Sequence, residues 1–593
     1  MKLALFLSVL PGLATGVYGD SEEWERELVD AWTTIGDCSP ETGICEGCGF
    51  GAAVVDLNGP DGAETRFYNA GPGEREAPWG PQDTWEIASI TKPFTAVATL
   101  ILEAEGVVTL DSAIGDFLPC NWTEANSQVA SVTLLEIIQH QSGFPAQPPD
   151  RGPSVGGNPF AGYTEDRLCA SLLKLNGLPT RGRYSYSNYA YGTLGYVLTL
   201  AVDSENPPDY EDIIKEKILV PLEMFDTSVT YDEPGWDNAA VGCSRGLARG
   251  QETIRLGAYE TLQGNGALRS TLEDVSKYLL AALYVDAGMP TPIDESVFGG
   301  LPPASDEITK LYDALAIAHS LENAATAACT CVSNWCEGLL CPLPNPNNEF
   351  ITSGGFEGYS SGGVGTWRKS GDTGGYSSRV AYSAAKGRAA VAVDTCGGCG
   401  SKGTAGSGAQ RAALLLVDGP PVLEPVESME DEPAEEFYIL FTGDAHSHNF
   451  PSVAQVNVEV TSTEDPNVVT VALSSSDGTG ATSRAVRAAG VDGAWIVEEP
   501  IFMGTGWGAS SDPFNQLDIP RTLIISNNWD TATYQDMGAD VHLAYVCDGR
   551  RCNDRILGNN EDEEGFPSLG PPEKSEDEMF PSGRVGKKRV GGP

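Results

Sequence analysis

A serine and a lysine stand one helical turn apart at the start of a largely apolar segment. Ser89 and Lys92 form a Ser-x-x-Lys sequence, and residues 96–102 follow it. If Ser89 begins a helix, Lys92 lies on the same face one turn later, with its amine beside the serine hydroxyl. A desolvated lysine with a lowered pKa can take the serine proton and produce a nucleophile. The alternative is an ordinary helix start with an exposed lysine.

A second group of residues could transfer protons and hold a substrate. Tyr186 and Asn188 lie in a short aromatic segment before an apolar helix predicted over 192–202. An unperturbed tyrosine titrates near about 10, so a lysine ammonium must lie nearby if the phenol is to act as a base. The Asn188 amide can bind a carbonyl or amide group. The alternative is a turn followed by a helix cap.

A third group precedes a glycine-rich turn and a predicted hairpin. It reads Lys369-Ser370-Gly371-Asp372. The small Gly371 lets the backbone approach a substrate, and the next N–H can donate to an oxyanion. Lys369 can hold a substrate carboxylate or tune a neighbouring tyrosine.

In this order, the three motifs resemble those of the class C β-lactamase-like serine hydrolases, a group that includes D,D-peptidases, D-aminopeptidases and certain esterases. Residues 139–145 resemble the family's His-x-Ser-Gly turn. Residues 221–227 resemble its Pro-Leu-Gly-Met-x-Asp-Thr segment, with Glu223 in place of the usual glycine, and 264–274 resemble its Gly-Gly-Leu-x-Ser-Thr-x-x-Asp segment. The resemblance covers roughly residues 45–418.

The resemblance implies an α+β fold for a hydrolase domain over residues 20–418. An antiparallel sheet would be flanked by helices, with an all-helical subdomain inserted and the site in the groove between them. Ser89 would be the acylated nucleophile, and Lys92 and Tyr186 would share its proton, with Tyr186 protonating the leaving group. The N–H groups of Ser89 and Asp372 would form the oxyanion hole. Which group first accepts the proton stays open.

The same comparison assigns substrate binding to Asn188, Lys369, Ser370 and Gly371. Many esterase-like relatives have histidine at the position of Lys369, whereas lysine there is typical of carboxylate-binding, penicillin-type sites. This favours a substrate with a free carboxylate. Asp372 argues against it, because its charge would repel one. β-Lactamase-like, D-peptidase-like and esterase activities therefore all remain open.

Charge limits the partners. The 593-residue chain has 83 acidic and 36 basic residues, for a net charge of −47. Such a chain repels nucleic acid and anionic membranes, so the expected partner is a small-molecule, peptide or ester substrate. Asp444, His446 and His448 alternate along one predicted strand, but three neighbouring ligands make a poor cage, and we predict no metal and no cofactor. The oligomeric state is not indicated.

The N-terminus predicts secretion. Residues 1–19 have a positive charge, a short apolar core and small residues, as in a signal peptide, although an uncleaved anchor is the alternative. No later run is long enough to insert into a membrane. Fourteen cysteines fit an oxidising compartment, and Asn121 begins a glycosylation sequon. The expected location is extracellular or the lumen of the secretory pathway.

A cysteine-rich stretch interrupts the resemblance at about 287–365, and we interpret it as a surface insertion stapled by disulfides. Its cysteines are Cys329, Cys331, Cys336 and Cys341. A zinc site is the alternative.

The family fold also implies a cross-strand pairing, because its first and last strands are antiparallel neighbours. Cys45 and Cys48 should then meet Cys396 and Cys399 and form disulfides. Zinc binding is again the alternative. A redox role is less favoured, because neither pair opens a helix of a thioredoxin-like unit.

The chain changes character after the hydrolase domain. Residues 419–436 form an acidic, proline-rich linker, 437–552 a small all-β sandwich or barrel in which Cys547 and Cys552 close a loop, and 553–593 a disordered tail. The predicted strands cover 438–442, 455–460, 468–473, 494–498, 522–525 and 541–546.

A second function class must be weighed against the hydrolase. The chain could be a binding or scaffold protein that keeps this fold without catalysis. The intact Ser89, Lys92 and Tyr186 favour the enzyme, and acylation of Ser89 would distinguish the two.

Overall fold

The computed structural model describes residues 21–33, 49–59, 62–70, 80–151, 160, 162–229, 242–244, 247–249, 260–288, 305–319, 325–326, 348–361, 364–373, 375–395, 405–418, 438–447, 450–463, 468–475, 480–487, 494–497, 521–525, 531–536 and 539–545. Several sequence-based predictions concern residues outside these ranges. They are the signal peptide at 1–19, the linker at 419–436, the tail at 553–593 and every cysteine proposed above for a disulfide.

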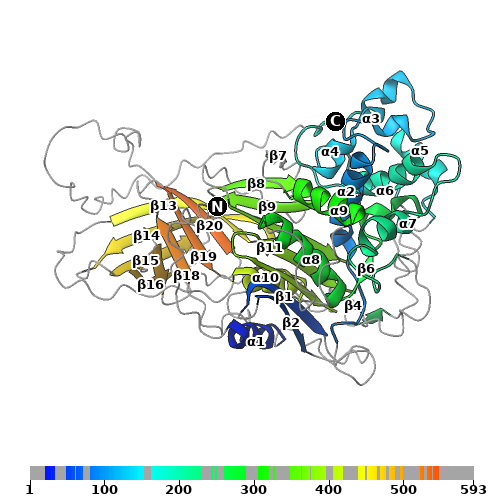
Figure 1. The fold of residues 1–593 in the computed structure, drawn as a ribbon. Helices are drawn as coiled ribbons and strands as arrows, with labels where there is room; N and C mark the ends of the chain where they lie inside the picture. Colours follow the sequence, from blue (N-terminus) through cyan, green and yellow to red (C-terminus); the bar gives the residue numbers. More distant parts are fainter. Residues whose placement is uncertain are drawn as a thin grey trace, which may run out of the picture.

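An eight-stranded antiparallel sheet forms the centre of the first domain, in the order β2-β1-β12-β11-β10-β9-β8-β7 (Figure 1). Its strands are β1 (Phe50–Gly59), β2 (Gly62–Ala70), β7 (Ala325–Thr326), β8 (Asn348–Ser353), β9 (Phe356–Ser361), β10 (Val364–Asp372), β11 (Ser377–Ser383) and β12 (Arg388–Asp394). Two small ribbons pair β3 (Trp85–Glu86) with β6 (Arg269–Ser270) and β4 (Gly242–Ser244) with β5 (Leu247–Arg249).

The first and last strands of the sheet are neighbours, as the resemblance implied. β1 and β12 are antiparallel, with Phe50 opposite Asp394. Beyond this pair, the Thr395 N–H donates to the Gly49 carbonyl at 3.0 Å, and the Gly49 N–H donates to Thr395 Oγ1 at 2.9 Å. The cysteines predicted to pair follow directly on either side but lie outside the described residues, so their disulfides stay a prediction.

Alternating side chains of β1 pack into two separate cores, because a strand directs successive side chains to opposite faces. Ala53 and Val55 belong to the larger core, and Ala52 and Val54 to the smaller one. All four are fully buried. The sheet is therefore covered on both faces.

Helices cover the two faces unequally. The α-helices are α1 (Ser21–Thr33), α2 (Thr91–Ala104), α3 (Ser127–Ala130), α4 (Leu134–Ile138), α5 (Glu165–Leu172), α6 (Asn188–Val202), α7 (Tyr210–Ile214), α8 (Leu272–Asp286), α9 (Asp306–Ala318) and α10 (Ala405–Asp418). Residues of α2, α6, α8 and α9 fill the larger core, and α1 and α10 fill the smaller. Figure 1 shows α2, α4, α5, α6 and α7 gathered at one end of the sheet. This confirms the predicted antiparallel sheet flanked by helices, with a separate helical region.

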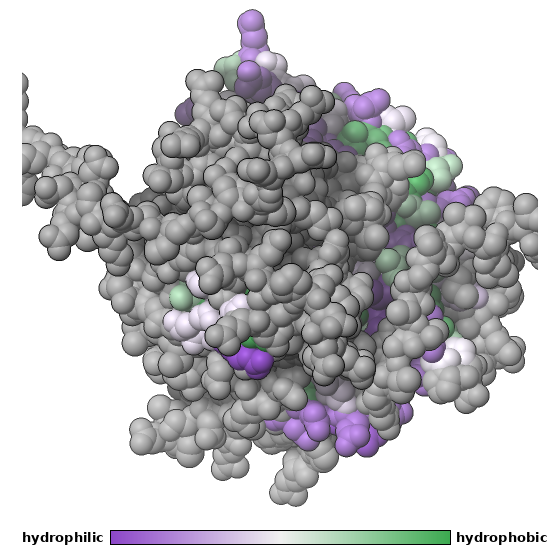
Figure 2. Space-filling model, turned by 90° about the vertical axis from the view of Figure 1, so that its left-hand side faces the viewer, coloured by the Kyte–Doolittle hydropathy of each residue, from purple (hydrophilic) through white to green (hydrophobic). Residues whose placement is uncertain are grey.

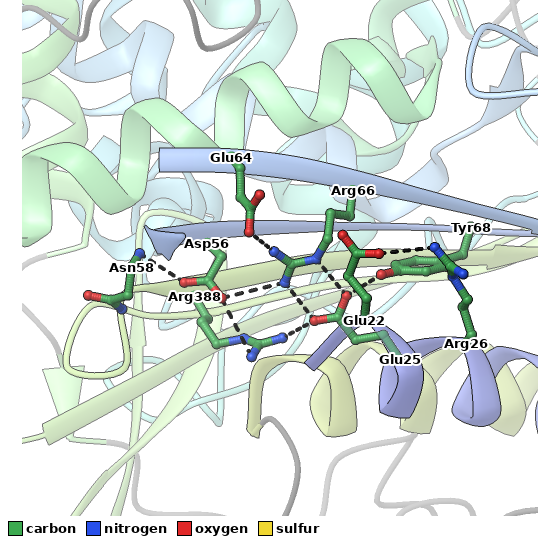
Figure 3. A network of polar contacts seen from close by, with 9 residues as sticks. All are labelled: Glu22, Glu25, Arg26, Asp56, Asn58, Glu64, Arg66, Tyr68 and Arg388. Atoms are coloured by element: carbon green, nitrogen blue, oxygen red, sulfur yellow. Dashed lines mark hydrogen bonds and ion pairs between the residues drawn. The ribbon is translucent and has the colours of Figure 1, made fainter. Parts of the chain in front are cut away.

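A buried carboxylate joins α1 to the sheet (Figure 3). Glu25 is fully buried and accepts from Arg66 Nε at 2.9 Å and from Arg66 Nη2 at 2.7 Å. Arg388 and Tyr68 also donate to the Glu25 carboxylate. Two guanidinium groups, one from β2 and one from β12, therefore hold one carboxylate of α1.

The stretch at 287–365, interpreted as a surface insertion, contains parts of the domain body. Helix α9 contributes Leu311 and Leu315 to the larger core, and β8 and β9 extend the main sheet. The interpretation is therefore incomplete for these elements, because its proline- and glycine-rich composition hid a helix and strands that pack against distant parts of the chain. The four cysteines of this stretch lie outside the described residues.

The structure contains a disulfide that the sequence did not predict, between Cys120 and Cys169. Their Cα atoms are 5.1 Å apart, although the residues are 49 positions apart in sequence. The bond links the segment after the 3₁₀ turn Ile114–Asp116 to α5. Asn121, the first residue of the glycosylation sequon, is exposed next to it.

The C-terminal region is all-β, as predicted. Its strands are β13 (Tyr438–Ser447), β14 (Phe450–Ser462), β15 (Val468–Ser475), β16 (Gly480–Arg487), β17 (Ala494–Val497), β18 (Arg521–Ile525), β19 (Thr531–Asp536) and β20 (Ala539–Tyr545). Consecutive strands are antiparallel, and β20 pairs back with β13, so the sheet closes on itself. The prediction missed β16 and β19, whose sequences are less apolar. The side chains of Asp444, His446 and His448 lie outside what the structure describes.

The described surface is mixed in character. On the face in Figure 2, hydrophilic residues gather at the lower edge, and hydrophilic and hydrophobic residues lie side by side towards the upper right. Among the described residues, we find no helix with both the length and the apolar character needed to cross a membrane.

Candidate active site

Ser89 lies in a tight turn that leads directly into a buried helix. The 3₁₀ turn Ala88–Ile90 continues into α2. Ala88 has a φ of 47°, in the left-handed region that residues with a side chain rarely adopt. Just before it, the Ile87 N–H donates to the Leu268 carbonyl at 3.1 Å. This strained turn therefore has support from the 268–270 segment, and strain of this kind concentrates at functional sites.

Two side chains contact the Ser89 hydroxyl. Lys92 Nζ lies 3.0 Å from Ser89 Oγ, and the Tyr186 hydroxyl lies 2.7 Å from it. Ser89 is partly exposed, whereas Lys92 is completely buried. The structure thus rules out the alternative of an exposed lysine at an ordinary helix start.

The surroundings of Lys92 favour a neutral amine. Its Nζ also lies 2.7 Å from Asn188 Oδ1 and 2.6 Å from the Asn265 carbonyl oxygen. Burial lowers the pKa of Lys92 well below its ordinary value of 10.5. The positive charge of Lys369 lowers that pKa further, and the negative charge of Glu357 raises it in part. A neutral amine can donate its two hydrogens to the two carbonyl oxygens, which leaves its lone pair for the Ser89 hydroxyl.

Tyr186 is held by the segment around His140. The N–H groups on either side of Tyr186 both bond to His140: Ser185 N–H to the His140 carbonyl at 2.7 Å, and Ser187 N–H to His140 Nδ1 at 3.3 Å. The His140 ring lies 4.7 Å from the Tyr186 ring. Burial lowers the pKa of His140 well below its ordinary value, which favours a neutral ring. Because Nδ1 accepts from the Ser187 N–H, the proton of a neutral ring is on Nε2. His140 therefore positions Tyr186.

The sequence left open a second interpretation, in which Tyr186 and Asn188 only form a turn and a helix cap. In the structure the capping residue is Ser187, which lies between them. Ser187 Oγ accepts from the Ala190 N–H at 2.9 Å and so caps α6. The Asn188 side chain is free for another role, and its Oδ1 contacts Lys92 and, at 3.2 Å, the Tyr186 hydroxyl.

Strand β10 packs directly against the turn that carries Ser89. A Cβ atom at Gly371 would lie 2.1 Å from the Ile87 carbonyl oxygen, so only glycine fits there. The pairing of β10 with β9 ends at Arg368, whereas its pairing with β11 continues to Asp372. The backbone segments that carry the two predicted oxyanion donors, Ser89 and Asp372, are thereby brought side by side.

Lys369 meets a carboxylate that sequence reasoning missed. Lys369 Nζ lies 2.6 Å from Glu357 Oε1, and both side chains are buried. The Tyr184 hydroxyl donates to the same oxygen at 3.2 Å. Lys369 Nζ also lies 4.5 Å from the centre of the Tyr186 ring. Glu357 falls in the stretch interpreted as an insertion, and no motif pointed to it.

The remaining predicted residue, Ser370, is partly exposed and has a protein partner. Its Oγ accepts from Arg379 Nε at 3.1 Å and from Arg379 Nη2 at 2.8 Å. The Asn265 carbonyl is a further contributor that the sequence could not assign, because a backbone atom has no residue signature. Within the described residues, no three histidine, cysteine or acidic side chains are grouped to hold a metal ion.

Comparison with known proteins places these residues in a family. The family model described as Beta-lactamase matches residues 44–397. A penicillin-binding protein of Bacillus subtilis (strain 168) is 23% identical over 265 residues, which cover 42% of this chain and 55% of that protein. Beta-lactamase-like protein 2 of Dictyostelium discoideum is 30% identical over 164 residues, which cover 27% of this chain and 29% of that protein. The alignments thus span about half or less of these relatives.

Solved structures also resemble part of the chain. The class C beta lactamase from Rhodobacter sphaeroides has a TM-score of 0.46 and 17% identity, and covers 66% of this chain and 98% of its own. The beta-lactamase/D-alanine carboxypeptidase from Yersinia pestis has a TM-score of 0.46 and 20% identity, and covers 67% and 99%. The family model spans more than half of the sequence, and on that basis the chain belongs to the beta-lactamase family.

Proposed function

We propose that this chain is a serine hydrolase that forms an acyl-enzyme on Ser89 and releases it to water, with an ester or an amide as substrate. The observation that carries the proposal is the double contact at Ser89 Oγ, with Lys92 Nζ at 3.0 Å and the Tyr186 hydroxyl at 2.7 Å. A partly exposed hydroxyl beside a buried amine is an arrangement that activates a nucleophile.

The first half of the proposed reaction is acylation of Ser89. Lys92 accepts the Ser89 proton as Oγ forms a bond to the carbonyl carbon of the substrate. The N–H groups of Ser89 and Asp372 stabilise the oxyanion, as preorganised donors do in acyl transfer. When the tetrahedral intermediate collapses, Tyr186 protonates the leaving alcohol or amine, and the proton held by Lys92 replaces the one that Tyr186 gave up.

Deacylation uses the same groups in the reverse order. A water molecule gives a proton to the Tyr186 and Lys92 pair and attacks the acyl carbon. Ser89 Oγ then leaves and recovers its proton. Asn188 stays bonded to Lys92 at 2.7 Å and holds the amine in position through both steps.

The range of substrates extends from amides to esters. A family relative named for penicillin binding supports an amide-type acyl donor. The activated serine itself accepts either class. A non-catalytic binding protein is not favoured, because nothing in a scaffold role requires Lys92 to be buried against Ser89.

The test is covalent labelling of the secreted or refolded chain with an alkyl fluorophosphonate, read by intact-mass spectrometry. We expect one adduct on wild type, none on Ser89→Ala, and an unchanged adduct on Ser127→Ala, which alters an exposed serine at the start of α3. Unlabelled wild type, or an adduct that survives Ser89→Ala, would exclude the proposal.

We further propose that the protein passes through the secretory pathway. The Cys120–Cys169 disulfide and the exposed sequon at Asn121 support this proposal. When the protein is expressed in a secreting eukaryotic cell, it should be found in the culture medium, and its mass should fall on treatment with an N-glycosidase. The mass of the Asn121→Gln variant should not change on this treatment. Retention of both proteins inside the cell would contradict it.

A further inference from the structure

We propose that the buried ion pair between Glu357 and Lys369 makes this site select substrates that place no carboxylate at Lys369, that is, neutral esters or amides. The inference rests on the proposed hydrolase function and narrows its substrate class. It runs against the expectation from sequence, in which Lys369 indicated a carboxylate-binding site.

Lys369 already has an anionic partner. Glu357 is 5% exposed and Lys369 is 2% exposed, and their charged atoms are 2.6 Å apart. Tyr184, also buried, donates a second hydrogen bond to Glu357 at 3.2 Å. Two donors converge on the carboxylate, so the pair has the additional hydrogen bond that a buried ion pair needs in order to persist.

An incoming carboxylate would meet the negative charge of Glu357 at Lys369. A second carboxylate at Lys369 would share one ammonium with Glu357, and two negative charges beside one positive charge in a buried place repel each other. Displacing Glu357 would leave a buried carboxylate without its cation, which is costly. A neutral ester or amide meets neither penalty.

The neighbouring basic side chains also have partners within the protein. Arg379 is buried, and its Nε and Nη2 already donate to Ser370 Oγ. Asp372, at the end of the same strand, is exposed and adds a further negative charge. Lys92 lies among the neutral acceptors Asn188 Oδ1 and the Asn265 carbonyl, which suit an uncharged amine.

The pair still has a role in the reaction through Tyr186. Lys369 Nζ lies 4.5 Å from the Tyr186 ring centre, so its charge acts on the phenol even when Glu357 offsets part of it. Lys369 therefore acts as a positioning and tuning residue at Tyr186, and Glu357 sets which substrates can approach.

The test compares two alkyl fluorophosphonates of equal length, whose alkoxy chains end in a methyl ester or in a carboxylate. The second-order rate of Ser89 labelling is measured by intact mass for wild type, Glu357→Gln and Glu105→Gln. Glu105 also pairs with a lysine, Lys217 at 3.0 Å, at the other end of α2, and serves as the matched control. Hydrolysis of each probe in buffer corrects for its intrinsic reactivity.

We expect wild type to react faster with the neutral probe by about tenfold or more, the scale of one desolvated charge contact. Glu357→Gln keeps the size and the hydrogen-bonding atoms but removes the charge, so the preference should shrink by about tenfold, through faster reaction with the anionic probe. Glu105→Gln should match wild type.

Two results would overturn the inference: wild type that reacts equally fast or faster with the anionic probe, or an unchanged preference in Glu357→Gln. Because the preference of wild type is itself decisive, the test holds even if the variant folds poorly. Failure of both probes to label Ser89 in wild type is a separate result, which would instead remove the hydrolase proposal.

Discussion

Two buried polar clusters lie on opposite faces of one sheet and differ in their basic residues. On the α1 side, Glu25 is bonded by the guanidinium groups of Arg66 and Arg388. On the other side, Lys92 meets Ser89, Asn188 and the Asn265 carbonyl, none of which is charged. Arginine keeps its proton in proteins, whereas a buried lysine can lose one. The first cluster is therefore suited to holding α1 in place, and the second to moving a proton.

The two clusters also differ in how many segments of the chain contribute to them. The Glu25 cluster joins α1, β2 and β12 and closes the smaller core (Figure 3). The Ser89 cluster gathers residues from the start of α2, the loop before α6, the turn before β6 and the end of β10. A candidate active site assembled from so many segments depends on positioning contacts such as those of His140, whereas the Glu25 cluster supplies its own geometry through bidentate bonds.

The largest expected effect is on the rate of Ser89 labelling. It compares Lys92, at the start of α2, with Lys217, which pairs with Glu105 at the other end of that helix. Lys92→Met should slow labelling of Ser89 by about a thousandfold, because it removes the base, and general-base catalysis contributes on that scale. Lys217→Met makes the same substitution in an ion pair with Glu105 at the far end of the helix. This variant should be labelled at the same rate as wild type. Labelling rates and melting curves check both variants. Equal rates in Lys92→Met and wild type would rule out Lys92 as the base.

The second prediction concerns a variant that disrupts the Glu25 cluster and should leave the labelling of Ser89 intact. Glu25→Ala leaves Arg66 and Arg388 buried without their carboxylate and should lower the free energy of unfolding by about 3 kcal/mol. Denaturant unfolding measures this loss, and labelling of Ser89 in the folded fraction should persist.

Glu22 provides the control on the same helix. It pairs with Arg26 on the exposed side of α1, with side chains 49% and 66% exposed. Glu22→Gln should change the unfolding free energy by no more than about 0.5 kcal/mol, because surface ion pairs contribute little. Similar losses for Glu25→Ala and Glu22→Gln would show that burial of the Glu25 cluster does not matter.

The third prediction tests positioning. His140→Ala removes the acceptor of the Ser187 N–H and should slow labelling by about a hundredfold, because small displacements of catalytic groups have effects of that size. His140→Asn should recover most of the rate, since an amide oxygen can accept the same bond and asparagine tolerates the φ of 54° at this position. If both variants lose activity equally, the ring has a different role.

Much of the site could be predicted because its residues lie in short motifs with a fixed spacing along the sequence. The helical turn between Ser89 and Lys92 sets their approach, and the family motifs supplied Tyr186, Asn188 and Lys369. Ser370 was placed near the site, but its hydroxyl is bonded to Arg379. Gly371 was expected to allow a substrate to approach, and the structure shows a second reason for it, the close approach of Ile87.

What could not be predicted depends on contacts distant in sequence. Glu357 reaches Lys369 only because β9 and β10 pair, and Glu25 meets Arg388 across 363 positions of the chain. The Cys120–Cys169 disulfide joins two segments that no motif connected. Single buried carboxylates have no pattern in sequence, because burial follows from the assembled sheet.

The most direct test of the account is the pH dependence of Ser89 labelling by the neutral fluorophosphonate. Burial lowers the pKa of Lys92 well below 10.5, and the amine accepts the serine proton only when neutral. The rate should therefore fall as the pH drops through this lowered pKa and be level above it, with the half-maximal rate well below pH 10.5. Lys92→Met should lack this step. A rate that rises only near pH 10.5, or the same profile in wild type and Lys92→Met, would contradict the claim that a neutral, buried Lys92 activates Ser89.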